Sequence, residues 1–207
     1  MTTVYLINNS LTMNNLNFPF KETLEQKREK RILSIEGENA SLELAHSPVL
    51  QNVTVIYSSP FVMSLGTAKY LSQILEKDIY IDSLIGERKI GALGDKKISM
   101  ISEVQENDFT YKLPGGESLN DVNIRMKRFM SNILEEHHDK EIAVFTHNVA
   151  ITSYLSSYCE KGFNLDNRLI LNYSDDAIID GTWDGITIIK LVFEGKDIIS
   201  ITREKCH

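Results

Sequence analysis

The 207-residue sequence predicts an α/β fold in which helices cover both faces of a mostly parallel central sheet, giving three layers. Three short runs, at 4–7, 53–57 and 142–146, are almost wholly apolar, which is typical of strands buried on both faces. Segments with apolar residues at helical spacing lie between them. This alternation favours right-handed crossovers and places binding groups at the carboxyl ends of the parallel strands.

Four helices are expected, and Ser34 is a suitable N-cap for the first of them. Their approximate ranges are 34–45, 61–75, 119–133 and 148–158. Two further apolar runs, at 186–193 and 197–202, are separated by a short turn and predict a hairpin that ends the sheet.

The composition limits the classes of partner. The chain carries 22 Lys and Arg against 29 Asp and Glu, a net charge of −7, which disfavours nucleic acid and anionic membranes as partners. The sequence has neither a secretory signal nor an apolar run of the roughly 18 residues that a membrane span needs. Two cysteines are too few for a disulfide framework or a cysteine-based zinc site. We therefore expect a cytoplasmic protein without metal or cofactor.

Residues 1–207 are expected to form a single domain. The segment at about 86–116 contains several glycines and has poor periodicity, so it is interpreted as a small cap or an irregular insertion. The polar segments at strand ends are the expected site, together with the loop that enters the third helix. In sequence letters they are NNS at 8–10, SSP at 58–60, THN at 146–148 and PGGES at 114–118.

These segments, in this order, resemble motifs of the histidine phosphatase superfamily, the phosphoglycerate mutase-like proteins. The segments that carry the resemblance are LSIEGENA, SSPFVMSLGTA, ERKIGALGD, PGGESL and THNVAI. In that family the first strand ends in Arg-His-Gly-Glu, whose histidine becomes phosphorylated, and TVYLINNSLT occupies its place here. The resemblance covers nearly the whole chain and implies the phosphoglycerate mutase-like fold.

The family's phosphoryl-transfer residues are largely replaced. Asn9 stands at the position of the nucleophilic histidine, while Asn8 and Met63 stand where the family has arginines and Ser10 stands where it has glycine. An amide is a poor nucleophile, and losing both guanidinium groups removes a forked phosphate grip. The resemblance therefore implies a catalytically inactive member, a pseudophosphatase that binds a small ligand or a protein partner.

Two residues match the family's catalytic positions and leave alternatives open. Glu117 corresponds to the proton donor and His147 to the second histidine, so they could form an acid–base pair with altered chemistry. A weaker alternative is a residual phosphatase with His147 as nucleophile and an arginine such as Arg88 or Arg125 as clamp. A structural role explains them as well. Glu117 could interact favourably with the dipole of the helix that follows it, and His147 could be a buried, hydrogen-bonded side chain.

The remaining candidates are binding residues. The segment 8–10 is either an ordinary turn after a strand or the polar floor of a pocket for a neutral ligand. Trp183 lies near a position where the family often contributes a pocket-edge residue, although a packed aromatic in a turn is the preferred interpretation. The candidate binding residues are Asn8, Asn9, Ser10, Ser58, Met63, Glu87 and Asn148.

Overall fold

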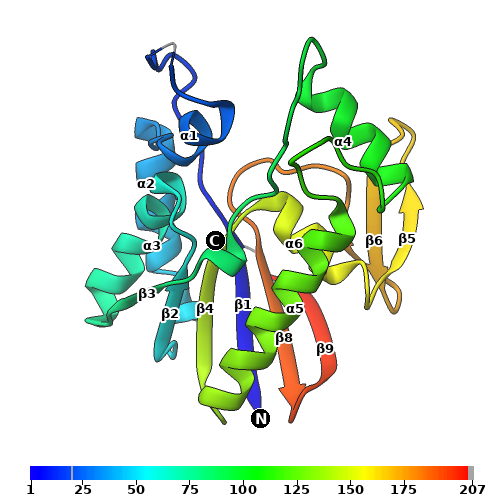
Figure 1. The fold of residues 1–207 in the computed structure, drawn as a ribbon. Helices are drawn as coiled ribbons and strands as arrows, with labels where there is room; N and C mark the ends of the chain where they lie inside the picture. The colour runs from blue at the N-terminus through cyan, green and yellow to red at the C-terminus, as the bar shows by residue number, and fades with distance from the viewer. Residues whose placement is uncertain (20, 205–207) are drawn as a thin grey trace.

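The computed structural model describes residues 1–19 and 21–204 and contains a six-stranded central sheet in the order β3-β2-β4-β1-β8-β9 (Figure 1). The first four strands in this order are mutually parallel, whereas β8 pairs antiparallel with β1 and β9 pairs antiparallel with β8. The mostly parallel α/β architecture is therefore confirmed. The sheet strands are β1 Thr2–Asn8, β2 Val55–Ser58, β3 Ile79–Ile81, β4 Glu141–Thr146, β8 Ile188–Glu194 and β9 Asp197–Glu204.

Helices cover both faces of this sheet, with α2 and α3 on one side and α5 and α6 on the other (Figure 1). Strand β1 shows why. Its side chains alternate, so that Val4 and Leu6 pack under α5 and α6 while Tyr5 and Ile7 pack under α2 and α3. The helices are α1 Leu24–Glu29, α2 Ile35–Ala45, α3 Val62–Leu75, α4 Ile98–Asn107, α5 Leu119–Glu136 and α6 Asn148–Leu155.

The four helices and the terminal hairpin expected from the sequence are present, and Ser34 caps α2 by accepting a hydrogen bond from the backbone of Gly37. The structure adds elements that the sequence analysis did not predict. The segment 86–116 contains helix α4, in which Ile101 and Gln105 are the buried side chains. A second, antiparallel sheet is also new; its strands are β5 Glu160–Phe163, β6 Leu169–Tyr173 and β7 Asp176–Ile179.

The chain between β1 and α2 makes an excursion that carries the short helix α1 towards the segment after residue 86. The guanidinium of Arg28 donates to the carbonyl oxygen of Arg88 at 2.8 Å, and Glu25 accepts from the backbone N–H of Ile90 at 2.6 Å. Helix α1 is thereby fixed beside the segment that precedes α4. No helix in the described ranges is both long and apolar enough to cross a bilayer.

Candidate functional site

The carboxyl ends of β1, β2 and β4 bring three polar side chains together. The backbone N–H of Asn9 donates to the carbonyl oxygen of Thr146 at 3.0 Å, and that of Ser59 donates to the carbonyl oxygen of Phe145 at 3.0 Å. These bonds hold both segments against the end of β4. His147 follows directly, as the residue before α6. Asn9, Ser59 and His147 therefore meet where parallel strands place their binding groups.

His147 is completely buried, and both of its ring nitrogens have protein partners. Nδ1 lies 3.0 Å from Oδ1 of Asn9, and Nε2 lies 2.8 Å from Oγ of Ser59. The amide nitrogen of Asn9 donates to the carbonyl oxygen of Ser10, which identifies Oδ1 as the atom that faces the imidazole. Because Oδ1 can only accept, Nδ1 carries the proton, and the hydroxyl of Ser59 donates to Nε2.

This environment keeps His147 neutral. Burial lowers its pKa from 6.5 to about 4. The charge of Glu87 opposes that shift, whereas the charges of Arg28 and Arg125 reinforce it. The ring of Phe61 packs edge-on against the imidazole, with centroids 4.6 Å apart. At neutral pH His147 is therefore an uncharged group in a closed hydrogen-bond chain, and it offers no positive charge to an anion.

Asn8 is buried, and its side chain bonds the protein's own backbone. Its amide nitrogen donates to the carbonyl oxygen of Gly185 at 3.0 Å, and its amide oxygen accepts from the backbone N–H of Thr187 at 2.6 Å. Both polar ends of the side chain are thus used to tie the end of β1 to the segment that enters β8. Asn8 lies in the predicted place, but in this structure it acts as a structural crosslink.

Ser10 is also buried in contacts within the protein. Its backbone N–H donates to Thr67 Oγ1 at 3.0 Å, and its hydroxyl donates to the carbonyl oxygen of Gly37 at 2.9 Å. A Cβ atom at Gly37 would lie only 2.0 Å from the carbonyl oxygen of Leu11, so glycine is required for this close approach. Ser10 therefore fixes the exit of β1 against α2 and α3.

The second predicted motif is packed in the same way. The hydroxyl of Ser58 lies 3.1 Å from that of Ser64, which donates to the carbonyl oxygen of Phe145 at 2.9 Å. The side chain of Met63 is buried in a small apolar cluster with Leu33 and Phe61. The position that the resemblance relates to a phosphate-binding arginine thus contributes to packing.

Glu117 is held by a two-pronged ion pair. Its carboxylate accepts from Nε of Arg125 at 2.9 Å and from Nη2 of Arg125 at 3.2 Å, and it also accepts from the backbone N–H of Lys89 at 2.9 Å. Both side chains are mostly buried. The remaining guanidinium nitrogen of Arg125 donates to the carbonyl oxygen of Leu84 at 2.6 Å. The pair therefore joins the loop before α5 to α5 itself and to the segment before residue 86.

Comparison with known proteins identifies the family of this chain. The sequence profile of the histidine phosphatase superfamily (branch 1) matches residues 21–191. The chain belongs to this superfamily. A relative, the "Probable phosphoglycerate mutase GpmB" of Salmonella choleraesuis (strain SC-B67), is 23% identical over 199 residues, covering 88% of this chain and 90% of that protein.

Solved structures show the same fold at low sequence identity. A native mycobacterial glucosyl-3-phosphoglycerate phosphatase has a TM-score of 0.66 and 14% identity, covering 98% of this chain and 96% of that one. Bacillus stearothermophilus YhfR has a TM-score of 0.65 and 19% identity, covering 96% of this chain and 94% of that one. The phosphoglycerate mutase-like fold is therefore established for this superfamily member.

The two remaining candidates, Glu87 and Asn148, do not bond the imidazole of this superfamily member. Glu87 Oε1 accepts from the backbone N–H of Arg88 at 2.8 Å, and its charge acts on His147. Asn148 is the first residue of α6 and lines a pocket of about 180 Å³ that also includes Arg88 and Trp183. Glu87 thus acts on the imidazole through its charge, while Asn148 lines a separate cavity.

The sequence analysis did not single out two neighbours of His147, although one of them, Ser59, lies in the expected segment 58–60. Ser59 could have been found, because it follows Ser58 in the same strand-end motif and its hydroxyl is a natural partner for an imidazole. Phe61 carries no such signal, since an aromatic at the start of a helix is most simply a packing residue. Arg28 was also missed, because only the tertiary fold brings α1 close enough for its charge to act on His147.

Proposed function

We propose that this superfamily member has lost phosphoryl transfer and works as a binding protein for a small ligand or a protein partner. The observation that carries the proposal is the state of His147. Its two nitrogens are occupied by Asn9 and Ser59, and its side chain has no exposed surface. A nucleophile or general base must reach the reacting atom, and this imidazole is enclosed by its own protein.

The position of the nucleophile supports the same conclusion. Asn9 stands where the family's phosphorylated histidine is expected, and its amide oxygen accepts a hydrogen bond from His147. An amide has no basic nitrogen with which to attack phosphorus. The substitution therefore replaces a reactive group with one that holds the neighbouring histidine in its neutral form.

The cationic grip on phosphate is also replaced. Asn8 bonds the backbone of the 185–187 segment, and Met63 packs in an apolar cluster. The nearby guanidinium groups are used elsewhere in the protein, Arg28 on Glu25 and Arg125 on Glu117. Arg28 and Arg125 are thus engaged and Asn8 and Met63 carry no charge, so a phosphate ester beside Asn9 and His147 would have no bidentate contact from these positions.

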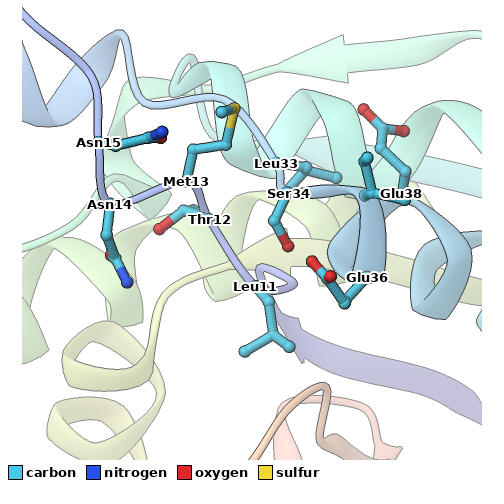
Figure 2. A pocket seen from close by; sticks show the side chains of 10 residues that line it. Leu11, Thr12, Met13, Asn14, Asn15, Leu33, Ser34, Glu36 and Glu38 are labelled. Atoms are coloured by element: carbon cyan, nitrogen blue, oxygen red, sulfur yellow. The ribbon is translucent and has the colours of Figure 1, made fainter.

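A ligand or partner surface is nevertheless available next to the replaced motif. Residues 11–15, 33–36 and 38 line an open pocket of about 570 Å³ (Figure 2). Its apolar rim includes Leu11, which is 50% exposed, and Ile35, which is 78% exposed. The amides of Asn14 and Asn15 stand beside this rim. Glu36 and Glu38 add two carboxylates to this lining. Exposed apolar groups bordered by amides and carboxylates disfavour phosphate and favour an uncharged ligand or a protein side chain.

The second candidate function is an enzyme with altered acid–base chemistry. One observation bears on which carboxylate would pair with His147. The carboxylate whose charge raises the pKa of His147 is Glu87, whereas Glu117 is engaged by Arg125. If acid–base chemistry exists here, the charge of Glu87 and the engagement of Glu117 by Arg125 favour Glu87 over Glu117 as the partner of His147.

The proposal is tested by a hydrolysis assay with p-nitrophenyl phosphate and sugar phosphates. Wild type and His147→Ala are compared after circular dichroism has shown that both are folded, and a competent superfamily member provides the scale. We expect no turnover above a protein-free blank for either protein. Turnover that rises with the wild-type concentration and vanishes in His147→Ala would refute the loss of activity.

A further inference from the structure

A second cavity lies apart from the buried histidine, between helices α4, α5 and α6 and the start of β6. It has a volume of about 180 Å³, and neither Asn9, Ser59 nor His147 lines it. The residues that matter for its chemistry are Arg88, Glu106, Asn148, Thr152, Arg168 and Trp183. A cavity of this size is smaller than the pockets that hold drug-sized molecules, so only a small molecule fits.

Arg88 is the unusual member of this lining. Its side chain is only 2% exposed, yet no carboxylate of the described residues lies within ion-pair distance of its guanidinium. Nη1 donates to the amide oxygen of Gln105 and Nη2 to the hydroxyl of Ser102 at 3.2 Å, and both partners are neutral. Nε is buried without any hydrogen-bond partner. The charges of Glu87, Glu25 and Glu106 act on Arg88 from beyond ion-pair distance. Buried charges are normally paired, so this cation lacks a counter-ion in direct contact.

The balance of charge around the cavity points the same way. Arg88 and Arg168 both line it, and Glu106 is the acidic residue among the lining groups. The guanidinium of Arg168 has no hydrogen-bond or ion-pair partner within the part of the chain that the structure describes. One carboxylate oxygen of Glu106 already accepts from the backbone N–H of Leu169 at 3.2 Å. The cavity therefore has an excess of positive charge.

Neutral groups complete the lining. Asn148 and Thr152 lie one turn apart on the same face of α6, and they bring an amide and a hydroxyl to the cavity. The first turn of a helix also favours negative charge, because its N–H groups are unpaired and the dipole is positive there. Trp183 adds an aromatic wall. Cations, neutral donors and a flat apolar surface are the usual components of a site for a small organic acid.

We propose that this cavity binds a small oxyanion, a carboxylate or phosphate group on a compact body, through Arg88 and Arg168. The inference goes beyond the proposed function, because it adds an anion site that shares no residue with the pocket beside residues 11–15. It does not involve the buried histidine, and the two claims can fail separately. Absence of a ligand here would leave the result of the hydrolysis assay unchanged.

Trp183 is the only tryptophan in the chain, so its fluorescence reports on this cavity directly. Inorganic phosphate, acetate and succinate are titrated into the full-length protein at constant ionic strength, with sodium chloride as the salt control. We expect a saturable change in Trp183 fluorescence with at least one of the three at millimolar concentration. The anion that acts at the lowest concentration distinguishes a phosphate site from a carboxylate site. No saturable change with any of them would overturn the proposal.

Three variants assign the response to the cavity. Arg168→Gln should weaken binding about tenfold or more, because it removes a charged donor that no other residue engages. Glu106→Gln should strengthen binding, because it removes the negative charge from the lining but keeps an oxygen that can accept from Leu169. Arg128→Gln is the matched control, since Arg128 is exposed on α5 and lies outside the cavity. Equal affinity in wild type and Arg168→Gln, or an equal loss in Arg128→Gln, would contradict the assignment.

Discussion

The amide oxygen of Asn9 lies 3.0 Å from Nδ1 of His147. These two residues are 138 positions apart in the sequence, yet they form one hydrogen-bonded unit. Ser59 completes the unit, because its hydroxyl lies 2.8 Å from Nε2. A histidine bridged in this way is held in one tautomer, and neither ring nitrogen is free to bond a ligand. The protein's own side chains thus occupy the space at the carboxyl ends of β1, β2 and β4. The contribution of these hydrogen bonds should be measurable as part of the free energy of unfolding.

Replacing Asn9 by Ala should lower the free energy of unfolding by about 1–3 kcal/mol. The substitution leaves Nδ1–H of a fully buried imidazole without an acceptor, and it removes the bond from the amide nitrogen to Ser10. Urea unfolding at pH 7 measures the change. Asn14→Ala is the control, since Asn14 is exposed, and its effect should stay within about 0.5 kcal/mol. Equal effects of the two substitutions would show that the Asn9–His147 bond contributes nothing.

The lowered pKa of His147 predicts a loss of stability in mild acid. Its folded pKa of about 4 lies below the unfolded value of 6.5, so the unfolded chain binds the proton more tightly between these values. Stability from this group is complete above about pH 7 and declines as the pH falls towards 4. Between pH 7 and pH 5 the loss should be about 2 kcal/mol.

A matched variant separates this effect from other titrating groups. His147→Gln removes the titration, so its unfolding free energy should change less than that of wild type between pH 7 and pH 5. Parallel pH profiles for the two proteins would show that His147 does not carry the acid sensitivity.

Glu117 is expected to act through structure. Glu117→Gln should cost about 2 kcal/mol of stability, because it weakens the two-pronged pair with Arg125 and leaves that mostly buried guanidinium without a full counter-charge. Lys112→Gln removes one member of the more exposed Lys112–Asp121 pair and should cost less than about 0.5 kcal/mol. Chemical denaturation of both variants makes the comparison, and equal costs would argue against a structural role for Glu117.

The sequence predicted the framework because its pattern is strong there. Apolar runs such as 142–146 predict buried strands, and the apolar stripe of α5 predicts a helix packed on the sheet. Because β1 and β4 are parallel, Asn9 and His147 then lie together at the carboxyl ends of these strands. Helix α4 escaped because it buries only two side chains, and strand β5 because most of its residues are exposed. Helix α1 did carry a signal, a capping box between Thr23 and Gln26, which could have been recognised.

The partners within the site were harder to predict. Ion pairs such as Glu117–Arg125 depend on how a loop folds back over its helix, and periodicity says nothing about that. The buried state of Arg88 depends likewise on α4, whose position no pattern in the sequence reveals.

The most direct measurement is the NMR titration of the His147 imidazole, assigned among the five histidines by its absence in His147→Gln. If the Asn9–His147–Ser59 chain closes the site, the His147 signals remain those of the neutral, Nδ1-protonated form from about pH 8 down to about pH 5.5, and the pKa is about 4. A midpoint near 6.5, moved upwards by added phosphate, would instead show that water and anions reach the ring, and it would contradict the closed site.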